Sequence, residues 1–382
     1  MRTLYLHIGF HKTGSTSLQL ALTQGRKCLS AEGFEFAALG KKGNSSGAVD
    51  VHKHDGRVSY SLNGRFDQLL RSAVGEKVIV SAEHLSFFHT AEQIAEVHKI
   101  CRRYFESTVI IAYVRRQDRQ AISFKQQAAR GCERDRSSSS KLLGHESGAF
   151  PRLTESVRDY YDYAAKLHLW VDHFGGQALR VRRFDTGDLK GGDIVTDFCA
   201  LLGLSPELES CRTNEAVSRK EFLFSHRLIE LGLDPQQLKK LKPRLQQDDS
   251  RLEPARAAAR AFCLQFEQSN RELDRCYLPH VSGLAFSDDF NGYPEEGNDQ
   301  LELADIAEWT CDLLASGLRN PLALRDALLI RPLQSLCEVS GLTPEYRRQL
   351  EALKRSLERT AEVPQERVRW WRLLLGPKRS GR

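Results

Sequence analysis

The sequence predicts a three-layer α/β fold in which helices cover both faces of a central parallel sheet. Three short apolar runs carry this prediction, at Leu4–Ile8, Lys77–Ser81 and Thr108–Val114. They are rich in β-branched residues, almost continuously hydrophobic and separated by helical material, a pattern typical of buried parallel strands. A fourth run, Ala178–Phe184, alternates between apolar and polar residues and is predicted to be an edge or half-exposed strand.

Helices are predicted wherever apolar side chains recur at helical spacing between polar ones. In the segment 153–174 the apolar residues follow this period, and Gly175 and Gly176 mark its end. The predicted helical ranges are 15–23, 91–105, 117–130, 153–174, 192–203, 216–232 and 251–276.

Two long polar stretches, 39–65 and 131–150, interrupt the helical and strand patterns. The first is rich in Gly, Ser, Asn and His, and the second contains the serine run 137–140. Loops of this length in a compact domain are usually functional lids or disordered segments, and both interpretations stay open.

The composition is that of a globular protein without a membrane-spanning segment. Of 382 residues, 41% are hydrophobic and 28% are charged, and no stretch approaches the roughly 18 apolar residues that cross a bilayer. The nine cysteines are scattered, which favours reduced thiols and argues against a disulfide framework or a zinc site. No secretory leader is evident and the chain starts in its first strand, so we expect a cytoplasmic enzyme of bacterial type.

The charge is concentrated at the C-terminal end. Residues 342–382 contain eleven Lys or Arg and five Asp or Glu, a net charge of +6 that equals the charge of the whole chain. The preceding part is therefore balanced, which excludes a surface built to coat nucleic acid.

A boundary is predicted near residue 294, where the segment 291–298 has the composition of a linker. We therefore predict a domain over 1–294 and an α-helical extension over 295–382, with short amphipathic helices near 301–316, 321–338 and 343–360. The basic, aromatic and apolar end at 367–375 is interpreted in two ways. We favour a helix that docks on the domain, and the alternative is peripheral contact with a membrane surface.

The most informative segment is the loop after the first strand. Its residues are Gly9-Phe10-His11-Lys12-Thr13-Gly14-Ser15-Thr16-Ser17. The N–H groups at the start of a helix are unpaired and carry partial positive charge, so a strand, a glycine-containing turn and a hydroxyl-rich helix start are suited to binding a phosphate. Lys12 adds a full positive charge.

The loop differs from that of the common nucleoside triphosphatases, in which lysine directly follows the second glycine. Here Lys12 precedes Gly14 by two positions and lies in the bend. The order Lys-Thr-Gly-Ser-Thr after an apolar strand resembles the 5′-phosphosulfate loop of the sulfotransferases that use 3′-phosphoadenosine 5′-phosphosulfate (PAPS). That family, which has a P-loop-like fold, more often has proline at the position of His11.

A second motif comes after the third strand, where Arg115 ends the apolar run and Ser123 stands eight positions later. In the family, an arginine and a serine at this spacing bind the 3′-phosphate of the donor. The chemistry fits, because a guanidinium group can bind a phosphate through two parallel hydrogen bonds. The resemblance covers about residues 1–294. In related enzymes a late basic loop closes over the 3′-phosphate, and the resemblance implies that Arg219-Lys220 would serve in this role here.

The resemblance implies roles for the loop residues. Lys12 would stabilise charge on the leaving phosphate, and the 5′-phosphate would be held by the loop from His11 to Ser17, through its backbone N–H groups and the hydroxyls of Thr13, Ser15 and Thr16. The expected general base is Glu83, which follows the second strand at its carboxyl end, where ligands bind in such sheets. His84 is the next candidate, because imidazole titrates in the right range.

We therefore expect a PAPS-dependent sulfotransferase that needs no metal and acts on a hydroxyl of a carbohydrate or glycolipid. Two alternatives stay open. A P-loop kinase or nucleotide hydrolase would need a magnesium ligand, usually an aspartate at a strand end, and neither neighbouring strand ends in one. A non-catalytic nucleotide-binding protein that reaches a partner or membrane through its basic tail is the other.

Overall fold

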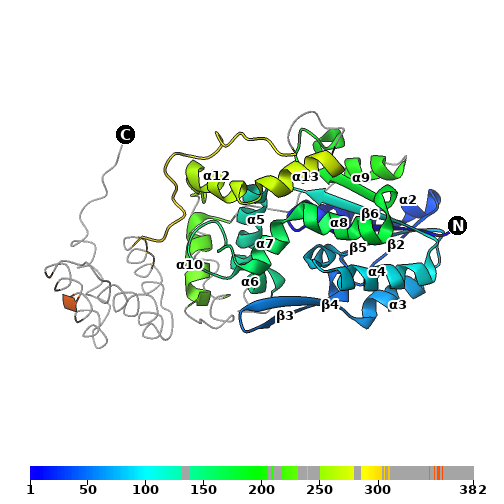
Figure 1. The fold of residues 1–382 in the computed structure, drawn as a ribbon, viewed down its shortest axis with the longest axis horizontal. Helices are drawn as coiled ribbons and strands as arrows, with labels where there is room; N and C mark the ends of the chain where they lie inside the picture. The colour runs from blue at the N-terminus through cyan, green and yellow to red at the C-terminus, as the bar shows by residue number, and fades with distance from the viewer. Residues whose placement is uncertain are drawn as a thin grey trace.

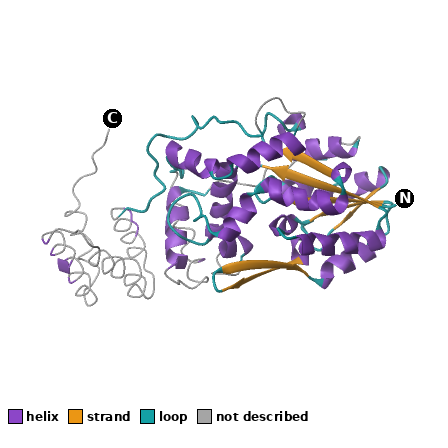
Figure 2. Ribbon diagram, viewed as in Figure 1, coloured by secondary structure: helices purple, strands orange, loops and turns teal. Residues whose placement is uncertain are grey.

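The computed structural model describes residues 1–130, 137–204, 208–209, 217–230, 239, 250–278 and 285–302, and the single positions 305, 309, 344, 348, 351, 352 and 355. Figures 1 and 2 show a central sheet with helices packed along both of its faces. The predicted three-layer α/β class is therefore confirmed.

The central sheet has five strands, all parallel, in the order β2-β5-β1-β6-β7. The four predicted strands are present as β1 (Thr3–Gly9), β5 (Lys77–Ser81), β6 (Ser107–Val114) and β7 (Leu179–Arg183). The last lies at the edge of the sheet, as its alternating pattern predicted. The other edge is β2 (Phe34–Ala37), which was not predicted because four residues carry little periodic signal.

The two faces of the sheet are covered by different sets of apolar side chains. Along β1, Leu4, Leu6 and Ile8 point into one core cluster, whereas Tyr5 packs against the other. This alternation is what a strand buried on both faces requires. Because β1 lies in the centre of the sheet, the loop after it starts from the most rigid part of the domain.

The helices observed in the described residues agree with the predicted ranges, with two divisions and three additions. Segment 153–174 divides at Asp162, whose carboxylate accepts a hydrogen bond from the N–H of Ala165 and so starts a second helix. Segment 251–276 divides near Phe266. The helices are α1 (Ser15–Gln24), α2 (Arg26–Ala31), α3 (Gly64–Ser72), α4 (Ala91–Tyr104), α5 (Gln117–Arg130), α6 (Ser138–Leu143), α7 (Glu155–Tyr161), α8 (Tyr163–Phe174), α9 (Ile194–Leu202), α10 (Arg219–Glu230), α12 (Arg256–Leu264) and α13 (Glu267–Tyr277).

The first polar stretch, 39–65, is ordered around an antiparallel hairpin of β3 (Val49–His54) and β4 (Arg57–Leu62). Val58 and Tyr60 of β4 are buried in the main core, so the hairpin covers apolar surface. Alternation over only six residues in each strand, among many polar ones, concealed this hairpin in the sequence.

In the second polar stretch, residues 131–136 lie outside the described residues, and the turns after α6 are held by a buried lysine. The ammonium of Lys125 donates to the carbonyls of Glu146, Gly148 and Phe150. A single charge thus satisfies three carbonyl groups that have no strand or helix to pair with.

The predicted linker at 291–298 packs against the domain, and Arg219 at the start of α10 helps to hold the residues at its C-terminal end. The Arg219 guanidinium donates to the carbonyls of Asn298 and Gln300 and forms a two-pronged ion pair with Asp305. These contacts give Arg219 an anchoring role in the fold, and its expected place over a phosphate stays a prediction.

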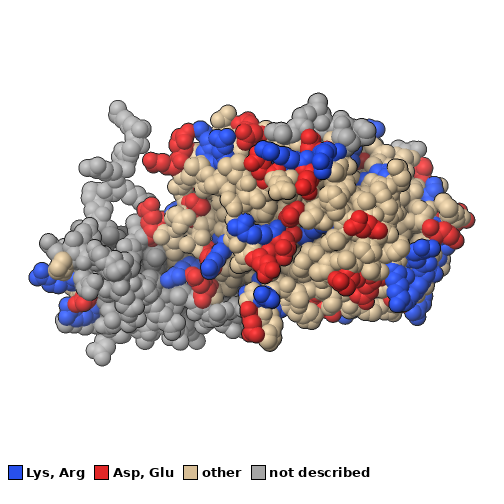
Figure 3. All heavy atoms as spheres, in the orientation of Figure 1, with Lys and Arg blue, Asp and Glu red and all other residues tan. Residues whose placement is uncertain are grey.

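The predicted helices at 321–338 and 367–375 lie outside the described residues, and those at 301–316 and 343–360 do so except at single positions. The division at residue 294 and the role of the basic end therefore stay predictions. Within the described part of the chain, no helix combines the length and apolar character needed to span a membrane. On the face shown in Figure 3, acidic and basic side chains of the described residues are mixed.

We expect Arg219→Ala to lower the free energy of unfolding by about 2 kcal/mol, since it removes several charge-assisted hydrogen bonds from a poorly exposed site. The matched control is Arg227→Ala on the same helix, which removes a more exposed pair with Glu230 and should change the free energy by less than about 0.5 kcal/mol. Chemical denaturation measures both, and equal effects would contradict the anchoring role of Arg219.

Candidate functional site

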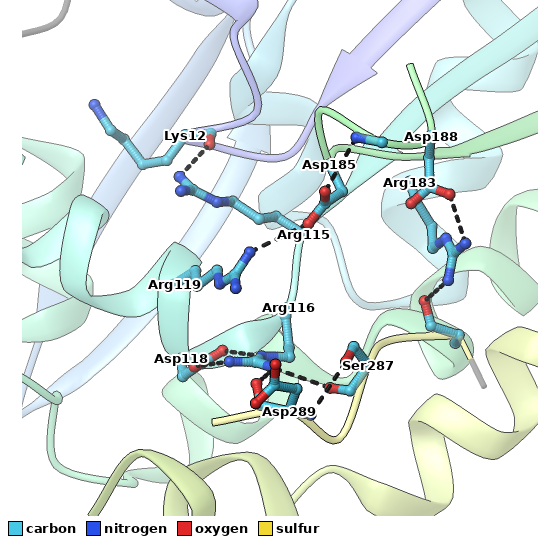
Figure 4. Close-up of polar contacts among 12 residues, drawn as sticks. Lys12, Arg115, Arg116, Asp118, Arg119, Arg183, Asp185, Asp188, Ser287 and Asp289 are labelled. Carbon is cyan, nitrogen blue, oxygen red and sulfur yellow. Dashed lines mark hydrogen bonds and ion pairs between the residues drawn. The ribbon is translucent and has the colours of Figure 1, made fainter. Parts of the chain in front are cut away.

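The carboxyl ends of four neighbouring strands bring the candidate residues to one edge of the sheet. In the order β5-β1-β6-β7, the segments after these strands carry Glu83, Lys12, Arg115 and Phe184. Adjacent strands lie about 4.8 Å apart, so the four positions span roughly 15 Å. Figure 4 shows the part of this edge from Lys12 to Arg183.

The loop after β1 makes a tight bend at Lys12 and Gly14. Lys12 has a φ of 67° and Gly14 a φ of 78°, both in the left-handed region. Such a φ is unfavourable for lysine, and strained residues of this kind cluster at functional sites. At Gly14 a Cβ atom would lie 2.8 Å from the ring of Phe184, so only glycine allows the loop to approach this ring.

The start of α1 is left without a capping side chain. Gly14 is the N-cap residue, no side chain caps the helix and no acidic residue lies in its first turn. The hydroxyl of Ser15 is buried, and no described residue meets the geometric criteria for a hydrogen bond with it. Thr16 is exposed and Ser17 is half-buried. A helix start without a cap, beside serine and threonine hydroxyls and Lys12, has the groups that suit binding of an anion.

Two other loop residues have side chains turned inward. The hydroxyl of the buried Thr13 donates to the carbonyl of Phe10 at 2.6 Å, so it braces the bend. The imidazole of His11 stacks on Phe124 with ring centroids 4.4 Å apart, and its Nδ1 lies 2.9 Å from the hydroxyl of Tyr160. Burial lowers the pKa of His11 well below its usual value, which keeps the ring neutral. Thr13 can therefore offer a phosphate only its backbone N–H, whereas the backbone N–H of His11 donates to the Tyr160 hydroxyl.

Glu83 begins the short turn η2 (Glu83–Phe87) after β5 and comes very close to β1. A Cβ atom at Gly9 would lie 2.5 Å from the Cβ of Glu83, and Gly9 has a φ of 76°, so glycine is required there for two reasons. The Nδ2 of Asn44 donates to the Glu83 carboxylate at 2.9 Å.

The surroundings of Glu83 act on its pKa in opposite directions. Burial raises the pKa of the Glu83 carboxyl, and this effect exceeds the opposing influence of Lys12, of the Asn44 hydrogen bond and of Ser15. The influence of Lys12 and Ser15 places this carboxyl next to the phosphate loop. A raised carboxyl pKa beside an anion site is the property expected of a general base.

His84 lies next to Glu83, and its ring sits between the loop and α6. Its Nε2 is 3.1 Å from the hydroxyl of Ser138, and its ring centroid is 5.4 Å from that of His11. Burial lowers the pKa of His84 to about 4, so the imidazole is neutral at physiological pH. This makes it a hydrogen-bonding group and a weaker base than the sequence predicted.

Arg115 connects the end of β6 to the phosphate loop. Its Nη1 donates to the carbonyl of Lys12 at 3.2 Å, and its guanidinium carbon lies 5.7 Å from the centroid of Phe184. Within the described residues no carboxylate forms an ion pair with it, whereas Arg116 and Arg119 pair with Asp118 and Asp185. Arg115 therefore supplies positive charge to this edge of the sheet (Figure 4).

Ser123 lies on α5, one turn beyond Arg119 and half-buried. Residues four apart share a helix face, so Ser123 is on the face that Arg119 turns towards Asp185. Arg119 is thus a charged neighbour of Arg115 and Ser123, the pair predicted to bind the 3′-phosphate. The sequence analysis did not select Arg119.

Arg116 holds together the segments next to Arg115. Its guanidinium forms a two-pronged pair with Asp118 and donates to the carbonyls of Ser287 and Asp289, which holds the segment 285–290 against the start of α5 (Figure 4). The amides of Gln117 and Asn270 exchange hydrogen bonds beside it. These residues therefore serve the structure around Arg115.

No role at the site was predicted for Phe184. Its half-buried ring lies against both Gly14 and Arg115. An aromatic residue as the last residue of a predicted edge strand, at the carboxyl edge, was the available signal. A ring in this place offers a face on which a planar base can stack.

Among the described residues, no group of three or more His, Cys, Asp or Glu side chains gathers where it could hold a metal ion. Lys12, Glu83, His84 and Arg115 are brought together at one edge of the sheet. Arg219 is held elsewhere by its own ion pair.

Comparison with known proteins gives a distant structural likeness. No family model matches the chain, and no curated protein matches it. A crystal structure of a sulfotransferase from Alicyclobacillus acidocaldarius is 17% identical, with a TM-score of 0.41, and the match covers 74% of this chain and 98% of that one. This likeness is too distant to assign a role to any residue of the site.

Proposed function

We propose that the protein is a sulfotransferase that moves the sulfuryl group of PAPS to a hydroxyl of a carbohydrate or glycolipid. The observation that carries the proposal is the pairing of two anion-binding features on adjacent strand ends. The uncapped start of α1 with Lys12 suits a 5′-phosphosulfate. Arg115, bonded to the Lys12 carbonyl, suits a second phosphate on the same nucleotide. PAPS has phosphates at both of these ends, whereas ATP has none at its 3′ position.

A third feature at this edge is the ring of Phe184, on which the adenine of the donor would stack. A donor lying along the carboxyl edge would then place its base over β7, its 3′-phosphate near Arg115 and its sulfuryl group towards Glu83. This direction follows from the strand order β5-β1-β6-β7 and agrees with the usual place of ligands in open parallel sheets.

The reaction is an in-line transfer between two oxygens. The Glu83 carboxylate takes the proton of the acceptor hydroxyl while the hydroxyl oxygen bonds to sulfur. The bond between sulfur and the bridging phosphate oxygen breaks, and its electron pair stays on the phosphate, leaving 3′-phosphoadenosine 5′-phosphate (PAP). Lys12 and the N–H groups of α1 stabilise the added negative charge, the effect that dominates such group transfers.

The acceptor class is supported by the groups around Glu83. Asn44 donates a hydrogen bond to the Glu83 carboxylate, and the neighbouring His84 contacts the hydroxyl of Ser138. Such a set of polar groups is suited to hydrogen bonding with a molecule that has several hydroxyls. Cytoplasmic location and peripheral membrane contact through residues 367–375 are proposals that rest on the sequence alone.

A P-loop kinase is the competing function, and one measurement separates the two. We expect PAP to raise the melting temperature of the protein, because both of its phosphates find a positive partner, while ATP and ADP give a much smaller shift with or without magnesium. A thermal-shift assay makes the comparison, with Arg219→Ala as the control that should respond to PAP as the wild type does. A larger shift with ATP and magnesium would overturn the proposal.

The 3′-phosphate contact can be tested through discrimination between nucleotides. We expect Arg115→Met to weaken binding of PAP by about 10- to 100-fold, because a charge-assisted contact is lost, and to leave binding of adenosine 5′-phosphate nearly unchanged. Lys12→Ala, the matched control, should weaken both nucleotides and keep their ratio. Isothermal titration calorimetry gives the four affinities, and an unaltered ratio in Arg115→Met would place the 3′-phosphate elsewhere.

The base can be tested through the pH dependence of turnover. Since Glu83 acts when deprotonated, kcat should rise with pH through its pKa, which burial holds above the ordinary glutamate value. Glu83→Gln should lower kcat by about 10²- to 10⁴-fold and remove this rise. Asn44→Ala removes a hydrogen bond that favours the carboxylate, so the rise should move to higher pH. An unchanged profile in Glu83→Gln would exclude Glu83 as the base.

A further inference from the structure

A buried lysine lies beneath the site and has no part in the proposed chemistry. Lys166, on α8, is 2% exposed. Its ammonium donates to the carbonyl of Ser86 and lies 4.5 Å from the centroid of the Tyr160 ring and 5.8 Å from that of Phe10. Burial lowers the pKa of Lys166 to about 7. Burying such a polar group is costly unless its partners compensate, so its contacts identify the elements that the side chain holds in place.

The first contact leads to Glu83. Ser86 belongs to the turn η2, which begins at Glu83, and the Ser86 hydroxyl donates to the carbonyl of Glu83 at 2.6 Å. Lys166 therefore binds the turn at one residue, and that residue binds the backbone of the proposed base. Ser86 and Glu83 are only three positions apart, so little flexibility remains between them.

The second contact leads to the phosphate loop. The ring of Tyr160, on which the ammonium sits, carries a hydroxyl that accepts a hydrogen bond from the N–H of His11 at 3.2 Å. The side-chain amide of Gln120 donates to the same hydroxyl and to the carbonyl of His11 at 2.8 Å. Tyr160 thus fixes the residue immediately before Lys12.

We propose that Lys166 is a positioning residue that keeps the Glu83 turn in register with the phosphate loop, through Ser86 on one side and Tyr160 on the other. The kinetic part of this proposal rests on the proposed function. The positional part concerns only the surroundings of the Glu83 carboxyl, so it is testable without turnover.

The direction in which the pKa of Glu83 moves separates positioning from simple charge. Burial raises this pKa, so a turn released into water by Lys166→Met should let it fall towards the ordinary glutamate value. Loss of a nearby positive charge alone would instead raise it. Carbon-13 NMR titration of the glutamate carboxyls, with Glu83 assigned by its absence in Glu83→Gln, measures the change. A rise, or no change, would overturn the proposal.

Lys125→Met is the matched control, because Lys125 is a second buried lysine held by backbone carbonyls. It should lower the melting temperature and leave the pKa of Glu83 as it is. If Lys166→Met does not fold, Ser86→Ala removes the hydrogen bond to the Glu83 carbonyl from the other side, and the same fall in pKa is expected with a smaller size.

Kinetics test the consequence for catalysis. In Lys166→Met we expect kcat for release of PAP from PAPS to fall at least 10-fold, while the affinity for PAP stays within about twofold because the Tyr160 hydroxyl is kept. The double variant with Ser86→Ala should lose less than the product of the two single losses, since both act on one turn. A folded Lys166→Met variant with the kcat of the wild type would overturn this proposal. If the wild-type protein itself shows no turnover, the proposed function is refuted, and the NMR titration alone then decides whether Lys166 positions the Glu83 turn.

Discussion

The constraint on which the site depends is the parallel pairing of β1 with β5 on one side and β6 on the other. This pairing brings the ends of three strands to the same edge, so the phosphate loop, the Glu83 turn and Arg115 become neighbours although they lie about 70 and 100 residues apart in sequence. The glycine at position 9 makes the approach possible, because any Cβ there would collide with Glu83. The strained φ of Lys12 and the uncapped start of α1 then give the loop the features that suit an anion.

Charges at this edge are divided between binding and support. Arg116, Arg119 and Arg183 each pair with an aspartate, and Arg116 also holds the segment 285–290 in place. Arg115 lies among them bonded to a backbone carbonyl. The paired arginines therefore add little net charge to the site and fix its shape. Arg115, Lys12 and the N–H groups of α1 are the positive groups of the loop itself.

Below the sheet edge, buried polar groups connect the elements that carry the reacting groups. Tyr160 and Lys166, from α7 and α8, contact both the residue before Lys12 and the turn of Glu83. The aromatic rings of His11, Phe87 and Phe124 fill the space between them. Within the described residues, Nε2 of His11 and Oε1 of Gln120 are buried without a hydrogen-bond partner, so this network is satisfied in part. It offers a reason for the unusual burial of a lysine and a histidine beneath a surface site.

The sequence by itself determined the fold class, the four main strands, the glycine-containing turn after β1 and the place of Arg115 at a strand end, because these features are local: strand-length apolar runs, a glycine turn and a residue at a strand end. Only the tertiary structure decided which residues serve that loop. It turned the side chains of His11 and Thr13 inward, tied Arg219 to Asp305, and placed Phe184 against Gly14. These outcomes depend on contacts between segments far apart in the chain, and a side chain's direction and partners are set by packing that no local pattern encodes.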